Sequence, residues 1–508
     1  MNRSRLHIAL LPLIALMLTG CPPDPIPFPR GWTEGYLLTP YKALPGRTIP
    51  AAFLGMGYAD KPDIRADLTI RIDNLEVASF QTHYGAGYYR LPGFPARSVD
   101  SYIESSSGGV VGSQYIEVAN FTKRQLGGEL TSATDLRWEE NEVIELTRSI
   151  SVPAGSRLTI ESGVMVFVGI GQNIDVSGDI SISGTRGAPV FFQCSDPAQA
   201  WGGIYLDGGR AEISNCLITQ GGGDDSRQFG HSQSQAVIGG RNASVIAEYT
   251  AIVDNKGKAF GLEGSTIKLE KCLVQRCDTG GEFAGTKVDI SGCWFLEMPD
   301  TTAIAVDDDN DALYFNGPHS SDTSYVLDSY FVQGKDDAID HNGALLVVSD
   351  CVIDGFDNEG VAASNARYIR IENCYIRNCE QGIEAGYGSP RVEVNHCTVL
   401  KCDTGLRFGD WYNWGCSGVL VVANSISIDN RLHNAWNFDV LADSAITGAL
   451  EISYSIVNDT TYNGGIGCIV GIPAIDEHGR LFTDPPQPGQ RAGADDHNMG
   501  RLSTWPPN

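Results

Sequence analysis

A short motif returns along most of this chain at a base interval of about 22 residues. It sets a small residue, often cysteine, two positions before an apolar one, as in Cys272-Leu273-Val274 and Cys374-Tyr375-Ile376. A unit this short cannot bury its apolar face alone, so its copies must stack into a solenoid. Longer intervals indicate the same coil carrying an inserted loop. The copies begin at Cys216, Thr250, Cys272, Cys293, Ser329, Cys351, Cys374, Cys397 and, less regularly, Ser425.

The period and the glycine or Asp-Thr-Gly turns are typical of a parallel β-helix, in which each coil pairs with the next at about 4.8 Å and like residues stack. With 59 Gly and 24 Pro the chain must also turn often. The sequence therefore predicts an all-β protein, a right-handed parallel β-helix preceded by a small β-sandwich. One inward column is predicted to comprise Ile218, Ile252, Val274, Phe295, Phe331, Ile353, Ile376, Val399 and Ile426.

The 13 cysteines fit the repeat better than a disulfide framework. Six of them share the rung position, where a small apolar side chain packs inward. Cys277, Cys379 and Cys402 each follow a rung cysteine at one spacing and predict a second column. A structural zinc site is the disfavoured alternative, because no His lies at ligand spacing. Cys416 and Cys468 fall outside both columns and are the best candidates for a disulfide.

The first residues have the form of an export signal. Arg3 and Arg5 precede an apolar run too short to cross a bilayer, and Leu18-Thr19-Gly20-Cys21 resembles the bacterial lipobox. This resemblance implies lipidation of Cys21 and a membrane contact through the lipid, and Pro22 after it suggests the outer membrane. Orientation toward the periplasm or the outside stays open. The predicted parts are the signal peptide 1–20, a Pro-rich tether 21–33, a β-sandwich 34–125, the β-helix 126–490 and a tail 491–508.

Residues 135–500 resemble exported β-helix proteins of the pectate-lyase-like fold. The resemblance rests on the rungs, on the segment from Val152 to Gly163, on Trp201-Gly202-Gly203-Ile204, and on the terminal Asp495 to Gly500. It implies a fold but not a function, since this fold serves lyases, hydrolases, adhesins and stalks. The formal charge of −26 makes nucleic acid an unlikely partner.

The acidic residues concentrate in two successive coils. Asp307 to Asp311 opens an insertion, and Lys335-Asp336-Asp337-Ala338-Ile339-Asp340 occupies the next turn. Neighbouring carboxylates repel one another unless a cation neutralises them, so a calcium site is predicted. Asp-Asp-x-x-Asp also resembles the calcium cluster of pectate lyases, and solvated turn carboxylates are the alternative. The candidate ligands are Asp336, Asp337, Asp340, Asp309 and Asp311.

Catalytic candidates are harder to assign. The pectate lyases that the cluster resembles have a lysine base, but the corresponding strand here offers Arg377, with Lys401 a coil further. A polygalacturonase-like reading meets Asn358-Glu359-Gly360 where that family has Gly-His-Gly. The outward position of successive coils reads Glu282, Asp340, Ala362, Glu384 and Arg407, which sets Asp340 and Glu384 about 10 Å apart. That spacing suits an inverting acid/base pair or an unrelated surface ladder. The candidates are Arg407, Arg377, Lys401 and Glu384.

Aromatic residues near Arg407 suggest a platform for sugar rings. Trp411 and Trp414 follow it in an insertion, and Tyr387 lies one coil earlier. A loop that folds its tryptophans over the helix is the equal alternative.

We therefore expect a monomeric cell-surface lipoprotein whose β-helix binds an extracellular polysaccharide, with calcium at the Asp cluster. Whether it also cleaves the polymer is open; if it does, a uronate lyase is favoured over a hydrolase. The alternative is a non-enzymatic envelope or adhesion protein.

Overall fold

The computed structural model describes residues 36–55, 65–72, 75–105, 110–129, 135–298, 310–317, 322–409, 415–437, 447–459, 461–462, 465–482, 487–495 and 497–502. Residues Trp32–Asn508 form one compact unit. The signal peptide, Cys21 and the tether lie outside the described residues. Among the residues described, none forms a helix of the length and hydrophobicity that crossing a bilayer requires.

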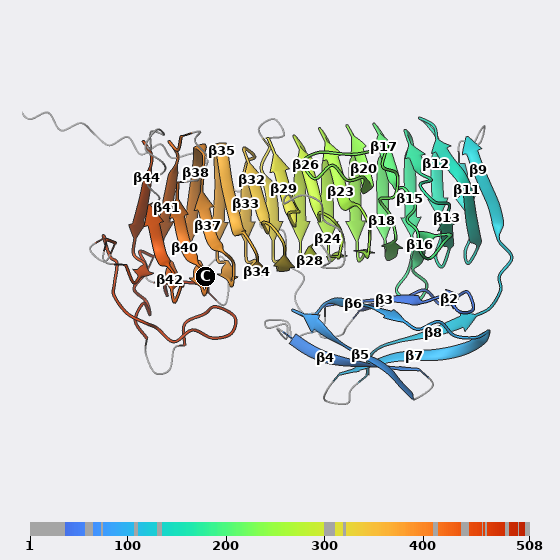
Figure 1. The fold of residues 1–508 in the computed structure, drawn as a ribbon, viewed down its shortest axis with the longest axis horizontal. Helices are drawn as coiled ribbons and strands as arrows, with labels where there is room; N and C mark the ends of the chain where they lie inside the picture. Colours follow the sequence, from blue (N-terminus) through green and yellow to red (C-terminus); the bar gives the residue numbers. More distant parts are fainter. Residues whose placement is uncertain are drawn as a thin grey trace, which may run out of the picture. The chain divides into compact units, whose positions relative to one another are not determined.

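Most of the chain is a parallel β-helix, as the repeat predicts (Figure 1). Each coil contributes a strand to each of three faces, and each strand pairs in parallel with its counterpart one coil away. The helix begins with β9 (Arg124–Glu129) and β11 (Val143–Val152), which pair with each other and run across two faces.

We call the first face the site face. Its strands are β14 (Ile174–Val176), β17 (Ile204–Asp207), β20 (Ala236–Arg241), β23 (Lys258–Glu263), β26 (Gly281–Ala284), β29 (Leu313–Asn316), β32 (Ile339–Asn342), the first part of β35 (Glu359–Glu372), β37 (Gln381–Ala385), β40 (Thr404–Phe408) and β43 (His433–Asn437).

The second face we call the docked face. It contains β13 (Met165–Val168), β16 (Val190–Cys194), β19 (Cys216–Thr219), β22 (Ala251–Val253), β25 (Leu273–Gln275), β28 (Trp294–Met298), β31 (Tyr330–Gly334), β34 (Val352–Phe356), β36 (Tyr375–Arg377), β39 (Thr398–Leu400), β42 (Ile426–Ile428) and β45 (Ile456–Val457).

The third face completes each coil. It contains β10 (Asp135–Trp138), β12 (Arg157–Ile160), β15 (Asp179–Ser183), β18 (Arg210–Ser214), β21 (Ser244–Glu248), β24 (Thr266–Glu270), β27 (Lys287–Ser291), β30 (Ser324–Leu327), β33 (Leu346–Ser349), the rest of β35, β38 (Gly388–Asn395), β41 (Val419–Ala423) and β44 (Ala449–Ser453).

The turns between faces repeat one backbone conformation. The residue before each rung position has a positive φ, as at Asn215 (49°), Asn373 (52°) and Asn424 (52°). Asparagine and aspartate tolerate this left-handed region better than other side chains, because their short polar groups bond locally. The turn residues thus place every rung side chain in register.

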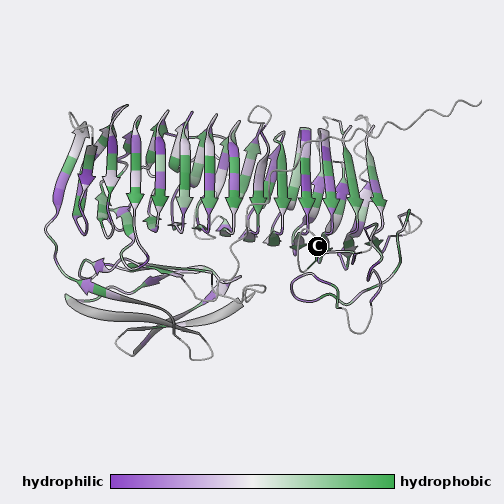
Figure 2. Cartoon of the chain, turned by 180° about the vertical axis from the view of Figure 1, so that it is seen from behind, coloured by the Kyte–Doolittle hydropathy of each residue, from purple (hydrophilic) through white to green (hydrophobic). Residues whose placement is uncertain are grey.

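The inward residues stack as predicted, with one correction at the end. Ile218 pairs with Ile252, and the column continues through buried residues to Val399. The next member is Ser427, because Val399 pairs with Ser427 and Ile426 packs on the outside of the coil instead. Figure 2 shows the resulting hydrophobic bands across successive strands.

The cysteines behave as core residues. All twelve cysteines from Cys194 onward are thiols, and all but Cys468 are buried. Burial raises the pKa of the Cys216 thiol far above its usual range. The predicted disulfide between Cys416 and Cys468 is wrong: Cys416 is buried in the core, and the Cys468 thiol donates to the Ile452 carbonyl at 3.7 Å.

An N-terminal β-domain precedes the helix. An antiparallel sheet orders β1 (Tyr36–Leu38), β3 (Ile49–Leu54) and β6 (Gly87–Leu91). A second, mixed sheet, in which only β2 pairs in parallel, orders β2 (Lys42–Ala43), β8 (Val110–Val118), β7 (Arg97–Ser105), β4 (Arg65–Ile72) and β5 (Leu75–His83). Phe53, Ile70 and Ile116 belong to the small core that they share.

This domain packs on the docked face. The indole of Trp294 donates to the Tyr84 carbonyl at 2.9 Å, and Arg90 bonds Asp254 at 2.7 Å. One apolar cluster includes Leu54 and Tyr88 of the domain together with Leu273 and Val352 of the helix. Further along, the C-terminal segment covers the same face, where the Thr398 hydroxyl donates to the Gly479 carbonyl.

Candidate functional site

Two columns of side chains run along the site face. The first stands at the start of each strand, and the second stands three residues later, facing the same side. The strand pairs and the turn hydrogen bonds define the register between successive coils. The first column comprises Lys258, Thr279, Asp311, Asp337, Glu359, Gln381 and Thr404; the second comprises Glu282, Tyr314, Asp340, Ala362, Glu384 and Arg407.

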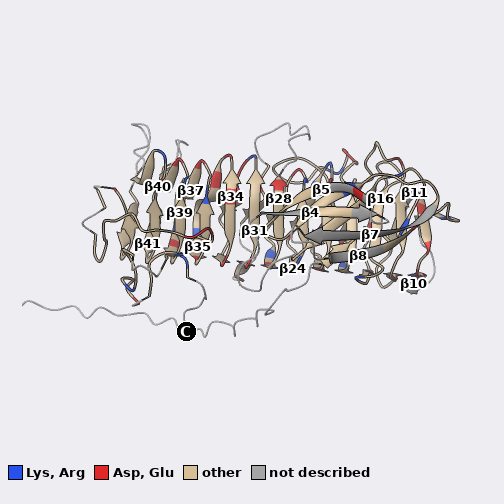
Figure 3. Cartoon of the chain, turned by 90° about the horizontal axis from the view of Figure 1, so that it is seen from below, with Lys and Arg blue, Asp and Glu red and all other residues tan. Residues whose placement is uncertain are grey.

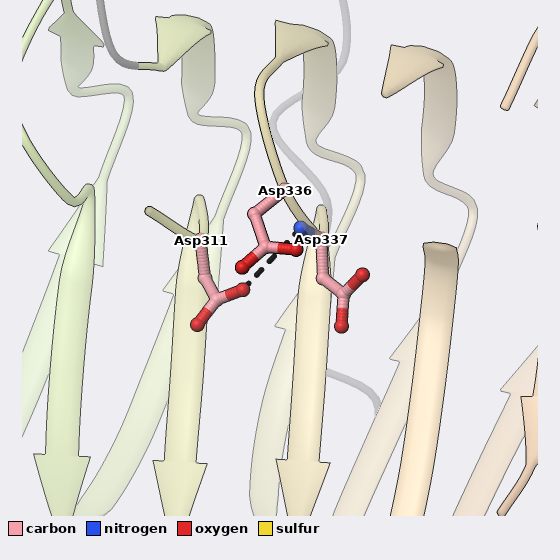
Figure 4. A group of neighbouring side chains, drawn as sticks. All are labelled: Asp311, Asp336 and Asp337. Carbon is pink, nitrogen blue, oxygen red and sulfur yellow. Dashed lines mark hydrogen bonds between the residues drawn. The ribbon is translucent and has the colours of Figure 1, made fainter. Parts of the chain in front are cut away.

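Three carboxylates converge where the first column is most acidic. Asp311 precedes β29, while Asp336 and Asp337 lie in the turn between β31 and β32 (Figure 4). One oxygen from each lies within 4.8 Å of the others. Asp311 and Asp337 are buried and Asp336 is half-buried. Figure 3 shows acidic residues at the turns along this edge of the helix.

Local hydrogen bonds orient the three carboxylates. Asp311 Oδ1 accepts from the Asp337 backbone at 3.3 Å, and Asp337 Oδ1 accepts from the Glu359 backbone at 2.7 Å. Asp336 Oδ1 accepts from the Asn358 amide at 3.0 Å. Because these donors belong to the turns themselves, the repeat geometry fixes where the carboxylates point.

The electrostatic environment is unfavourable for charge on Asp337. Burial, the negative charge of Glu359 and a side-chain hydrogen bond with Glu359 raise the pKa of Asp337 well above its usual range, and Asp311 and Asp336 add to the effect. Charge on Asp337 is therefore disfavoured by its carboxylate neighbours. A bound divalent cation would relieve this repulsion.

The donor set fits a hard cation such as calcium. All three donors are carboxylate oxygens, which is the ligand type that calcium prefers, and the group contains no sulfur or imidazole. The structure thus contains an Asp cluster that could hold a metal ion, as the calcium prediction requires.

A buried arginine adjoins the cluster through Glu359. Arg407 Nη2 bonds Glu384 and lies 3.8 Å from Glu359 Oε1. Gln381 donates to that same Glu359 oxygen. Arg407, Glu359 and Glu384 are each less than a tenth exposed. A continuous chain of contacts thus runs from Asp311 through Asp337 and Glu359 to Arg407 and Glu384.

The other predicted residues have different surroundings. Arg377 ends β36 on the docked face, where it bonds Asp354 at 2.6 Å and Tyr84 at 3.1 Å, so it does not join the cluster. Lys401 is exposed in the turn after β39, three coils from the Asp336 turn or about 14 Å. Asp340 lies in the second column, outside the convergent group, with Ala362 between it and Glu384.

Part of the aromatic platform can be located. Tyr387 is half-buried in the bend after β37, where its carbonyl accepts from the Asn365 backbone at 2.9 Å. Trp411, Trp414 and Asp309 lie outside the described residues.

Sequence reasoning missed several members of the two columns. Glu359 was noted only as a mismatch with another family's motif, although its position matches that of Asp337 one coil earlier. Lys258 was missed because the insertion before it hides its register; its ammonium group is fully buried and bonds Glu282. Tyr314 was missed because an insertion at 301–309 precedes its coil; it pairs with Glu282 in the second column. Aligning every coil at the turn, rather than at the cysteine rung, finds all three.

Comparison with known proteins agrees with the fold. The family described as right-handed β-helix region matches residues 306–430, which include the cluster and Arg407. The fold is therefore a right-handed parallel β-helix, as predicted. A solved structure described as the periplasmic alginate epimerase AlgG is similar over 67% of this chain and 85% of that one, at a TM-score of 0.38 and 9% identity. A similarity this low carries no conclusion about this chain's chemistry. Among curated proteins none matches.

Proposed function

We propose that this protein is an exported lipoprotein whose β-helix binds an extracellular polysaccharide on the site face, with calcium at Asp311, Asp336 and Asp337. The observation that supports it best is the convergence of the three carboxylates beside the buried Glu359, Arg407 and Glu384. On a chain of charge −26, acidic sugars would be repelled unless a cation joins them to this surface. A uronate-containing polymer is therefore the substrate class we favour.

The same residues could support β-elimination on a uronate. Bound calcium would neutralise the sugar carboxylate and make the adjacent C–H more acidic. The Arg407 guanidinium is a hydrogen-bond donor with no lone pair to offer, so it would stabilise developing negative charge rather than remove the proton. Glu384 is then the candidate base, because a carboxylate can accept a proton and Arg407 holds it in position.

A hydrolase is the second candidate, and one observation favours it. Burial and the neighbouring carboxylates raise the pKa of Asp337, and a carboxyl group with a raised pKa suits a general acid. Asp340 and Glu384 are about 10 Å apart by register, near the spacing of inverting glycosidases.

Calcium titration by calorimetry in metal-free buffer tests the cation site. We expect the wild type to bind one Ca²⁺ and Asp336→Asn to bind about tenfold more weakly or worse, because it removes one charged ligand. Asp340→Asn is the matched control and should titrate like the wild type, since Asp340 lies outside the group. Identical titrations for the wild type and Asp336→Asn would overturn the site.

Incubation with polygalacturonate and polymannuronate, with calcium or with EDTA, separates the functions. An unsaturated product seen by ultraviolet absorbance indicates a lyase, and new reducing ends without it indicate a hydrolase. Binding without either product indicates an adhesion protein. The anchor is tested separately: Cys21→Ala should move the protein from the membrane fraction to the soluble one.

A further inference from the structure

A cavity of about 400 Å³ lies on the same face, nearer the N-terminal end of the helix. Its floor is the backbone of β20 and β23, where Gly239 and Gly261 occupy the second column. In the same column the preceding coil presents Tyr205 and the following coil presents Glu282. Two successive glycines thus open a hollow in a column that elsewhere carries larger side chains.

The hollow is closed on one side by the segment that joins β19 to β20. Arg227 and Phe229 of this segment line the cavity together with Tyr205. A Cβ atom at Gly261 would lie 2.9 Å from the Phe229 ring and 2.8 Å from Ala236 Cβ, so the glycine is what lets the ring approach. Phe229 and Tyr205 give the cavity its apolar surfaces.

This wall is held in place before any ligand arrives. The Phe229 carbonyl accepts from the buried Lys258 ammonium at 2.6 Å, and the His231 backbone donates to Glu282. Arg227 makes two hydrogen bonds to Asp175, one of them 3.2 Å long, and its guanidinium lies 5.6 Å from the Tyr205 ring centre. The buried Lys258–Glu282 ion pair thus fixes this segment at Phe229 and at His231.

The charges around the cavity indicate what it can accept. Two arginines, Arg227 and Arg241, face three carboxylates, those of Asp175, Asp207 and Glu263, which leaves the lining with a net charge of −1. An anionic sugar would meet no unmatched positive charge here. Alternating forked donors and carboxylate acceptors instead match vicinal hydroxyls, and the aromatic rings match the C–H face of a pyranose.

We propose that this cavity binds one neutral pyranose residue. It goes beyond the proposed function, because it needs neither calcium nor the acidic cluster. The cavity floor and the cluster are separated by three coils, from β20 to β29, or about 14 Å. Together with a uronate at the cluster, this site would select a polymer that contains both neutral and acidic sugars.

Calorimetry in EDTA with maltohexaose, cellohexaose, mannohexaose and galactohexaose tests the proposal, with hexagalacturonate as the anionic comparison. We expect at least one neutral hexasaccharide to bind and Tyr205→Ala to weaken it about tenfold or more. Tyr205→Phe keeps the ring and should retain most of the affinity. Arg227→Ala should also weaken binding, because it removes a forked hydrogen-bond donor from the lining.

Tyr115→Ala, an exposed tyrosine of the N-terminal domain, is the matched control. Melting curves show whether each variant is folded. The proposal is overturned if no neutral hexasaccharide binds, if hexagalacturonate binds more tightly than all of them, or if Tyr205→Ala behaves like Tyr115→Ala. Calcium titration of Tyr205→Ala should match the wild type, so a failure here is distinguishable from a failure of the cation site.

Discussion

The docked face and the site face are built from the same coils, but their charged side chains have different neighbours. On the docked face Arg276 bonds Asp254 at 2.6 Å and Glu297 at 3.0 Å, and Arg90 completes the group. On the site face the carboxylates of Asp311, Asp336 and Asp337 converge within 4.8 Å of one another, and Glu359 lies between Asp337 and the buried Arg407. Ion pairs join two parts of the fold on the docked face, whereas converging carboxylates form a candidate cation site on the site face.

Two carboxyl groups make this contrast measurable. Burial opposes charge on Glu297, but hydrogen bonds from His83 and Gln275 and the charge of Arg276 outweigh it and lower its pKa to about 2. Burial and neighbouring carboxylates raise the pKa of Asp337. Burial opposes charge on both groups, but the direction of the pKa shift depends on whether the neighbours are cations or anions.

The largest effect should follow from removing Arg276, the cation that pairs with two carboxylates on the docked face. Arg276→Ala leaves Asp254 and Glu297 without their shared partner, and we expect a loss of about 3–5 kcal/mol in the free energy of unfolding. Chemical denaturation at neutral pH measures it. Arg210→Ala, which breaks an exposed pair on the third face, should cost under about 0.5 kcal/mol. Equal losses in the two variants would contradict the contrast.

A smaller effect of opposite sign is expected on the site face. In EDTA at neutral pH, Asp337→Asn should be more stable than the wild type by about 1 kcal/mol, because it removes the cost of charging a buried carboxyl. The folded-state pKa is raised above 3.8, so this cost is absent below pH 3.8, grows as pH rises above it, and levels off above the folded-state pKa. The gain should therefore vanish near pH 3, and a gain that persists there would contradict the assignment. Asp179→Asn, on the third face, is the control.

An effect of similar size is expected on the docked face at acid pH. Glu297 has a folded-state pKa below its ordinary 4.5, so its contribution is complete above that pH and is lost as pH falls toward 2. We expect Glu297→Gln to lose less stability than the wild type over this window, by about 1 kcal/mol, since the side chain is partly exposed. Denaturation midpoints between pH 5 and pH 2.5 measure it. Parallel pH profiles for the two proteins would contradict the lowered pKa.

The repeat alone was enough to predict the coil, because a ladder of like residues reports strand pairing directly. Phe295 and Phe331 could be placed in one column across a long insertion, and they stack with ring centres 5.1 Å apart. The last rung failed because Ile426 and Ser427 differ by one position, and a one-residue slip exchanges the inside and outside of a strand.

The cluster was predicted in part for a related reason. Asp336 and Asp337 share a turn, so their proximity could be read from the sequence, and Asp311 follows by register. The position of Arg377 could not be read in the same way, since it depends on Tyr84 of another domain, 293 residues away along the chain. The cavity at Gly239 depends on an inserted wall whose path no repeat specifies.

The N-terminal domain has a consequence for how the solenoid responds to stress. In a solenoid each coil contacts only its neighbours, so the coils can come apart one at a time. Here a single domain contacts the docked face at two places far apart along it. Arg47 donates to the carbonyls of Cys194 and Ser195, and Tyr84 accepts from Arg377. Opening any coil between these two places must also disturb the contacts of the domain with the other coils. The domain thus couples the coils that it contacts, so we expect them to unfold together rather than one at a time.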